Sequence, residues 1–519
     1  DNFFVGGSLM NLSERSITQK ANYGVEPVNN TMLGLNAVFS SEIPVITRLL
    51  NKLPNIKTNV PSVISFKGEL AYLHASKPKS SGYENAATVY IDDFEGSETN
   101  IDLKDTYSWT LSSVPLGVKG SEFQTNDLRK GHYRAKLAWY NIDPVFYSRQ
   151  RPSEIDDNEL SKNETRRIFI DEIFPQQDLI EGQSRIQNTL DINFIPNLKG
   201  PYNNKSDFFN NDLKDNWAGI TRKINSTNFE QSNVEFIQFW LLDTFSDSQS
   251  IENDLGSLVI NLGNISEDIL SDGKKLYENG LPSRNSQQLV NTSNWGKSPV
   301  TQSLVYSFDS DPNNRILQDL GYDGLNDSDE LNIYTNGSID DPAGDNYEYY
   351  LNANGGIQDR YLNYNGVQGN SPVSTTDSNR GSTTIPDSED ANQDNTMNTI
   401  DSYFQYRIPI KKIMNVNNHP FVSDVRENVS VDLPNGQKLN TRWIQFKIPV
   451  FQQFYKNSRY ANYFEAINDI DNLRSIRFMR IFLKDFTSPV TFRFGTLDLV
   501  RTDWKRYSKN LNKQNITYN

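Results

Sequence analysis

Three segments near the start of the chain are predicted as strands, and the second and third of them alternate well between apolar and polar residues. They run from Phe3 to Leu12, from Thr31 to Ser40 and from Ser62 to Leu73. Neighbours such as Leu35 and Asn36 then fall on opposite faces, because successive side chains of a strand point in opposite directions. Each segment has about ten residues, the length of a tilted strand that crosses a bilayer. A soluble antiparallel sheet gives the same alternation, so both interpretations stay open at this point.

A short helix and a linker are the other elements predicted in this part of the chain. Residues from Ile43 to Pro54 form an amphipathic stretch bounded by prolines, which predicts a short helix. Residues 76–86 are polar and rich in Lys, Ser and Gly, and this composition predicts a linker. We therefore place the first domain boundary near residue 78.

The rest of the chain reads as short strands joined by long loops, the pattern of a sandwich or jelly roll. Residues 270–400 are its least hydrophobic part. The sequence around Phe236 to Trp240 is similar to that of Trp443 to Lys447, either through duplication of a sandwich or by chance. The predicted strands are Ala87 to Gly96, Ala135 to Tyr140, Arg167 to Ile173, Leu190 to Ile195, Val234 to Leu242, Gly256 to Leu262, Tyr403 to Ile408, Trp443 to Ile448, Ile476 to Ile481 and Val490 to Leu499.

These elements predict an all-β protein in four parts. Residues 1–78 supply a few transmembrane β-barrel strands, and residues 79–300 form a first jelly-roll-like β-sandwich. Residues 301–400 form an acidic, loop-rich connector, and residues 401–519 supply the strands of a second β-sandwich.

Composition removes several classes of function. The net charge is −14, a field that repels phosphate backbones, so we expect no nucleic-acid partner. No cysteine is present, which excludes disulfides, thiolate metal sites and thiol nucleophiles. There are three histidines, far apart in sequence, and the adjacent acids Asp92 and Asp93 point to opposite faces of a strand. We therefore expect no enzyme. No apolar run reaches the roughly 18 residues of a membrane helix, which leaves strands as the way to cross a membrane.

The acidic connector contains a candidate calcium loop between Asp319 and Glu330. Its spacing follows a twelve-residue pattern in which alternate positions converge on Ca²⁺, and Gly324 falls where that pattern requires a glycine. Gly321 stands at position three and supplies no side-chain ligand, so we expect weaker binding. The predicted ligands are Asp319, Asp323, the backbone carbonyl of Leu325, Asp327 and Glu330.

A second loop, from Asp390 to Asp401, has the same spacing, with Asn395 where glycine is preferred. Neither loop is clearly flanked by helices, and an acidic, solvated loop with turn-forming residues explains both patterns equally well. The predicted ligands of the second loop are Asp390, Asn392, Asp394, Asn398 and Asp401. Calcium is the one cofactor that the sequence suggests.

Several stretches resemble the SprA/Sov family of type 9 secretion translocons. They are Asn2 to Arg15, Tyr90 to Ser97, Ala135 to Pro144, Asn261 to Asp268, Gly280 to Pro282, Arg477 to Arg480 and Leu497 to Trp504. Members of that family are large outer-membrane barrels of Bacteroidetes that export folded proteins and the adhesins of gliding motility.

The resemblance implies an internal fragment of such an export channel, which agrees with a chain that begins at Asp1 without an initiator methionine or a signal segment. It implies that the inserted domains are extracellular and cap the mouth of the channel. It also implies the partners: secreted cargo with C-terminal signal domains, a PorV-like barrel, a periplasmic plug protein and outer-membrane lipid. The alternative is a cell-surface glycan-binding protein or adhesin built from jelly-roll modules.

Overall fold

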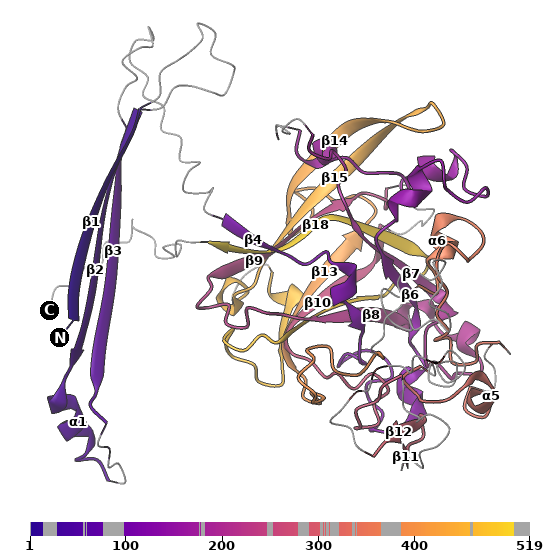
Figure 1. The fold of residues 1–519 in the computed structure, drawn as a ribbon, viewed down its shortest axis with the longest axis horizontal. Coiled ribbons are helices and arrows are strands. Elements are labelled where there is room, and N and C mark those ends of the chain that lie inside the picture. The colour runs from indigo at the N-terminus through magenta and orange to yellow at the C-terminus, as the bar shows by residue number, and fades with distance from the viewer. Residues whose placement is uncertain are drawn as a thin grey trace, which may run out of the picture. The chain divides into compact units, whose positions relative to one another are not determined.

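The computed structural model describes most of the chain and divides it into two compact units, residues 1–97 and 98–519 (Figure 1). The described residues are 2–13, 29–54, 58, 60–75, 98–175, 177, 182–246, 253–278, 290–300, 305, 307, 311, 321–334, 338, 340–364, 386–456 and 460–502. The predicted strand from Ala87 to Gly96 lies outside them. None of the helices in these ranges has the length and apolar character needed to cross a membrane.

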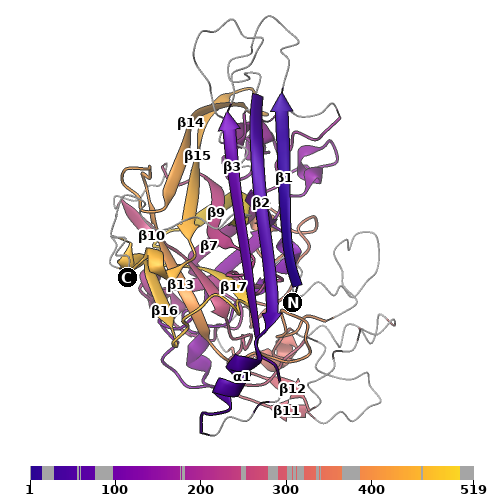
Figure 2. The same ribbon diagram turned by 90° about the vertical axis from the view of Figure 1, so that its left-hand side faces the viewer.

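The first unit is a three-stranded antiparallel sheet in the order β1 (Asn2–Ser13), β2 (Asn29–Glu42) and β3 (Val63–Ala75) (Figure 2). The register aligns Leu35 with Gly7 on one side and with Leu70 on the other. Because aligned residues share a face, most apolar positions of β2 and β3 lie together, while β1 has apolar residues on both faces. The short helix α1 (Pro44–Leu50) follows β2 and begins at the proline that predicted it.

The second unit is built from two antiparallel sheets (Figure 1). The six-stranded sheet has the order β16 (Phe464–Ile467), β13 (Ser402–Lys411), β10 (Asp254–Asn264), β17 (Phe478–Lys484), β8 (Trp217–Lys223) and β5 (Thr110–Leu111). The seven-stranded sheet has the order β14 (Val422–Asp432), β15 (Lys438–Pro449), β9 (Val234–Leu242), β18 (Val490–Thr502), β7 (Leu190–Lys199) and β6 (Ala135–Tyr140), and β4 (Glu98–Asp102) also pairs with β18. A small hairpin pairs β11 (Val290–Thr292) with β12 (Lys297–Pro299).

One apolar core fills the space between the two sheets. It takes Phe194 from β7 and Phe239 from β9, and Leu258 from β10 and Ile481 from β17. The rings of Phe239 and Phe446 stack with centroids 4.9 Å apart. The two sheets therefore form a sandwich, and burial of each such aromatic side chain stabilises it by about 1.5–3 kcal/mol.

The all-β fold is confirmed, but the division into two sandwiches is not what the sheets show. β10 pairs with β13 and β17, and β9 pairs with β15 and β18, so strands from both predicted sandwiches alternate within each sheet. The two similar segments lie in β9 and β15, which are adjacent strands in which Phe239 aligns with Phe446. In both segments the isoleucine and the phenylalanine contribute to the same core.

The predicted strand from Arg167 to Ile173 is also wrong. Its second half forms a helical turn, α3 (Ile170–Ile173). The Glu172 carboxylate accepts a hydrogen bond from the Phe169 N–H and pairs with the Arg166 guanidinium at 2.8 Å, and both charged side chains are buried. This local network turns the chain, which apolar alternation alone does not reveal.

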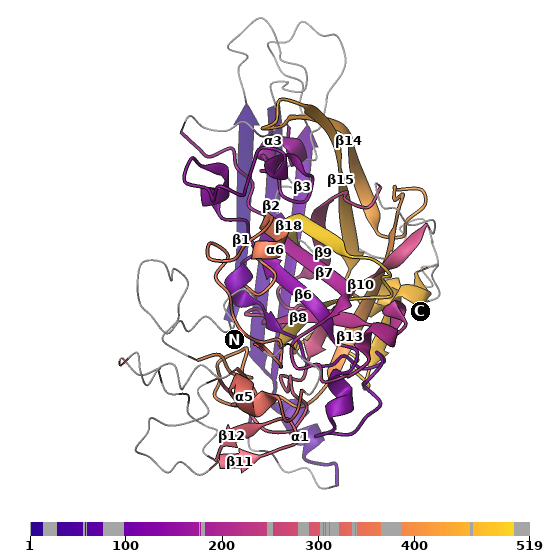
Figure 3. The same cartoon turned by 90° about the vertical axis from the view of Figure 1, so that its right-hand side faces the viewer.

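Loops lie over the seven-stranded sheet around β6 (Figure 3), and a cluster of buried tyrosines packs between them and the sheet. Tyr140 points outward from β6 and stacks on Tyr361, with ring centroids 4.2 Å apart. Tyr361 follows the helical turn α6 (Ile357–Arg360), and its hydroxyl accepts a hydrogen bond from the Asp143 N–H. The segment around α6 is therefore anchored on the sandwich by aromatic packing.

Candidate metal centre

Tight turns position Asp323 beside the small hairpin of the sandwich unit. Gly321 and Gly324 both have positive φ values, 66° and 64°, which L-residues with side chains rarely adopt. The Asp323 carbonyl accepts a hydrogen bond from the N–H of Lys297, at the start of β12. A Cβ atom on Gly321 would lie 1.9 Å from the Asp345 Oδ2 atom, so only glycine leaves room for that carboxylate.

Glu330 is positioned by the short helix α5 (Asp327–Glu330). The Asn326 side chain caps this helix by accepting hydrogen bonds from the N–H groups of Ser328 and Asp329. The Glu330 side chain is buried, and its Oε2 atom accepts a hydrogen bond from the Ala343 N–H at 2.9 Å. This bond draws the segment that carries Asp345 toward the helix.

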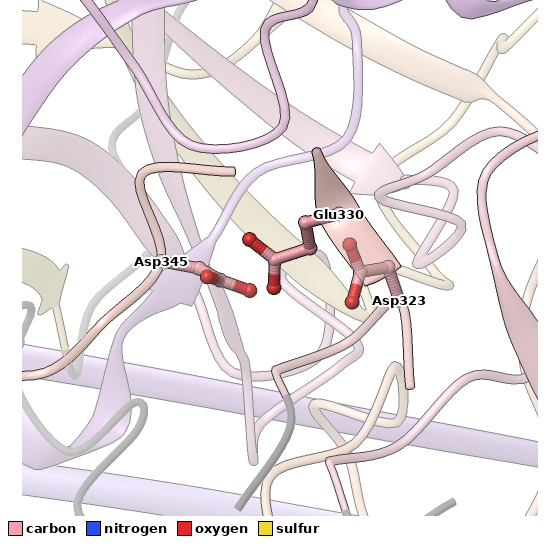
Figure 4. Close-up of side chains that lie close together, drawn as sticks. All are labelled: Asp323, Glu330 and Asp345. Atoms are coloured by element: carbon pink, nitrogen blue, oxygen red, sulfur yellow. The ribbon is translucent and has the colours of Figure 1, made fainter. Parts of the chain in front are cut away.

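Asp345 completes the arrangement. The Asp345 N–H donates to the Asp341 Oδ1 atom, and the Ala343 carbonyl accepts from the Tyr202 N–H at 2.7 Å. Asp323, Glu330 and Asp345 each present a carboxylate oxygen, and these oxygens lie within 4.8 Å of one another. Figure 4 shows the three side chains pointing toward a common centre.

The three carboxylates concentrate negative charge in a region with little access to water. Burial, with the charges of Asp345 and Glu330, holds the pKa of Asp323 well above its usual range. Burial also raises the pKa of Asp345, and it raises the pKa of Glu330 to about 7. These pKa values rise because a charged carboxylate with neither water nor a cation beside it is destabilised by other carboxylates nearby.

The predicted first loop and the observed centre share two residues, Asp323 and Glu330. Asp319 lies outside the described residues. Asp327 is exposed, and its Oδ1 atom accepts a hydrogen bond from the Asn346 side chain. Leu325 has a buried side chain, and its N–H donates to the Asp323 Oδ1 atom.

Asp345 was not predicted, because it lies beyond the twelve-residue window. The repeated acids between Asp340 and Asp345 were its only signal in the sequence.

The second predicted loop is arranged differently. The buried ammonium of Lys275 pairs at 2.9 Å with the carboxylate of Asp390, which the pattern makes the first ligand of a cation. Asp390 also accepts hydrogen bonds from the N–H groups of Asp394 and Asn395. The remaining predicted ligands are likewise engaged: Asn392 and Asp394 bond to each other, Asn398 donates to the Ile265 carbonyl, and Asp401 accepts from the Ser266 N–H. The structure thus gives these side chains protein partners.

Comparison with known proteins points to one family. Residues 324–519 match the family model SprA_N, described as a motility related/secretion protein. The match takes in Glu330, Asp345 and every strand from β13 to β18. No curated protein matches the chain. The family resemblance expected from the sequence is therefore confirmed.

Proposed function

Since residues 324–519 match the family model of a motility related/secretion protein, we propose that the chain is part of an outer-membrane channel for protein export. On this proposal β1, β2 and β3 are strands of the channel wall. The sandwich unit covers the extracellular mouth. The cargo is a set of secreted proteins with C-terminal signal domains, including gliding adhesins, and the channel meets a PorV-like barrel and a periplasmic plug protein.

The observation that carries the proposal is the exposed apolar face of the first sheet. Its aligned positions bring Leu9 beside Leu33, Leu35 beside Leu70 and Phe39 beside Phe66. Leu9, Leu70 and Phe66 are 72%, 68% and 63% exposed, values that a soluble sheet face rarely shows over such an area. Lipid is a solvent in which such a face is stable.

The opposite face has the character of a wall that meets water. On β2 and β3 it carries Asn36, Lys67 and Glu69, and the charged groups of the last two pair at 2.8 Å, whereas on β1 it also carries Phe4 and Met10. An apolar face outward and a polar face inward is the alternation of strands that line an aqueous channel.

The strand length also suits a membrane. β3 has 13 residues, and at about 3.3 Å per residue it extends about 40 Å. A tilt of about 45° reduces this to roughly 30 Å, close to the hydrocarbon thickness of a bilayer.

A matched pair of substitutions tests the assignment of the two faces. Leu35→Arg places a charge on the apolar face, and Asn36→Arg places the same charge one residue away on the polar face. We expect Leu35→Arg to destabilise the inserted strand by about 2–4 kcal/mol near the middle of the membrane, because the guanidinium would enter hydrocarbon. The amount of parent protein in outer-membrane fractions should fall for Leu35→Arg and stay near wild type for Asn36→Arg. Equal amounts of the two variants would contradict a lipid-facing sheet.

Depletion of the parent protein tests the export role. Signal-bearing cargo should accumulate in the periplasm, while a protein exported by another route should be secreted as before. Normal secretion of the cargo would contradict the proposal, even if the sheet were shown to face lipid.

A further inference from the structure

We propose that Asp323, Glu330 and Asp345 bind a calcium ion in the sandwich unit. This inference does not depend on the proposed export function. It rests on the three carboxylates that converge in Figure 4 and on buried oxygen atoms, aimed into the same space, that have no partner. It rests also on the lack, among the described residues, of an ion pair that would balance the three charges.

The first step concerns the burial and hydrogen bonding of the carboxylate oxygen atoms. Asp323 is fully buried, and its Oδ2 atom has no hydrogen-bond partner. The Oδ2 atom of Asp345 is likewise buried without a partner, although the residue as a whole is partly exposed. Buried polar atoms are nearly always satisfied, so two unpartnered carboxylate oxygens in one place indicate a missing ligand.

An uncharged side chain points to the same place. Tyr334 is 1% exposed, and its buried hydroxyl faces the Asp323 carboxylate. Burial, and then the charges of Asp323, Asp345 and Glu330, raise the pKa of this hydroxyl. A hydroxyl oxygen is a further neutral donor for a hard cation or for a water bound to it.

The second step is the charge. Among the described residues, no Lys or Arg forms an ion pair with Asp323, Glu330 or Asp345. Lys136 is near enough to interact with Asp345 but is not within ion-pair distance, and the Arg134 guanidinium donates to backbone carbonyls instead. Three carboxylates that lie close together with little solvent and without a counter-charge require either protons or a cation.

The third step is the identity of the cation. All the side-chain donors are oxygen atoms, which favours Ca²⁺ or Mg²⁺ over transition metals. Ca²⁺ accepts carboxylates in a flexible geometry, whereas Mg²⁺ demands a near-ideal octahedron and keeps several waters. Three carboxylates from separate segments, with oxygens within 4.8 Å of one another, suit the more flexible sphere of calcium.

Calcium at this centre would join three separate segments of the chain. Asp323 belongs to the turn beside β12, Glu330 to α5, and Asp345 to the segment held by Tyr202. One cation would fasten all three to the same corner of the sandwich.

The test uses the 519-residue chain in detergent and compares two variants. Asp345→Asn removes a ligand of the observed centre. Asp327→Asn removes a carboxylate that the sequence pattern includes but the structure leaves outside, and its amide oxygen keeps the acceptor for Asn346. Calcium affinity is measured by calorimetry, and Tm is measured in chelator and in millimolar calcium, with magnesium as a separate arm.

We expect calcium to raise the Tm of the wild-type chain and of Asp327→Asn by the same amount. Asp345→Asn should bind calcium on the order of tenfold or more weakly, because affinity follows the number of charged ligands. In chelator Asp345→Asn should melt no lower than wild type, since one of three repelling charges has been removed. If Asp345→Asn does not fold, Glu330→Gln gives the same comparison.

Two results would overturn the proposal. The first is a wild-type chain whose Tm and heat of mixing do not respond to calcium, which would mean that protons balance the centre. The second is a loss of affinity in Asp327→Asn as large as that in Asp345→Asn. A response to magnesium equal to that to calcium would overturn the identity of the ion.

Discussion

Gly321 shows how a single residue can be misjudged from a sequence motif. In the twelve-residue pattern it stands at a ligand position and counts as a loss. In the structure its missing side chain is what admits the Asp345 carboxylate, since a Cβ there would meet the Oδ2 atom at 1.9 Å. The glycine therefore makes room for a ligand from elsewhere in the chain.

Gly321→Ala should lower stability more than backbone strain alone explains. A positive φ costs a non-glycine residue about 1–2 kcal/mol, and the new methyl group would also displace Asp345. Gly436→Ala is the matched control, because Gly436 has a φ of 81° and open space around its Cβ position. Chemical denaturation in calcium should show a larger loss for Gly321→Ala. Equal losses would contradict the close approach of Asp345.

At this scale the sequence predicted two of the three carboxylates. Asp323 and Glu330 lie within one short window, where spacing carries information. Asp345 reaches the centre through the Tyr202 backbone bond and the glycine turn, and neither of these contacts has a sequence signature.

At the scale of elements, the burial of a strand determines whether its sequence alternates between apolar and polar residues, and so whether the strand could be predicted. β9 was predicted with its observed bounds, from Val234 to Leu242, and β18 was predicted over most of its length. β14 was missed, because it lies at the edge of its sheet and most of its side chains are partly or fully exposed. β8 was also missed, because it is buried on both faces and shows no alternation.

The helical turn α6 gives a prediction at this scale. Tyr361→Ala removes the ring that stacks on Tyr140, and a buried aromatic truncated in this way costs about 3–5 kcal/mol. We expect local release of the segment, seen as faster hydrogen exchange at residues 351–364. Tyr361→Phe is the control, because it keeps the stacking and loses only the acceptor for the Asp143 N–H. Unchanged exchange in Tyr361→Ala would show that polar contacts, such as those of Gln358 with Thr491 and of Arg360 with Glu154, hold α6 without the ring.

At the scale of the whole molecule, the fold class could be predicted and the domain division could not. Apolar alternation and aromatic content depend on local sequence, so they indicate an all-β chain. Pairing between strands depends on partners far away in the chain, and the long acidic segment between β12 and β13 looked like a boundary. The sheets instead cross it, since β10 lies between β13 and β17.

Dividing the chain at residue 400 tests this arrangement. Residues 98–400 alone should fail to unfold cooperatively, because β9 and β10 lose their observed strand neighbours. Mixing with residues 401–519 should restore a cooperative thermal transition, measured by calorimetry and circular dichroism. A stable, cooperative 98–400 fragment would support two separate sandwiches after all.

The position of β18 determines when its sheet can be completed as the chain is synthesised. The last described strand of the chain lies inside its sheet, hydrogen-bonded to β9 and β7, and it also pairs with β4, the first strand of the unit. The strands β4, β7 and β9 must therefore wait for the end of this region to be synthesised before their pairing is complete. Such distant pairing is slow and leaves strand edges open meanwhile. The newly made chain consequently exposes these unpaired strand edges for as long as β18 is missing.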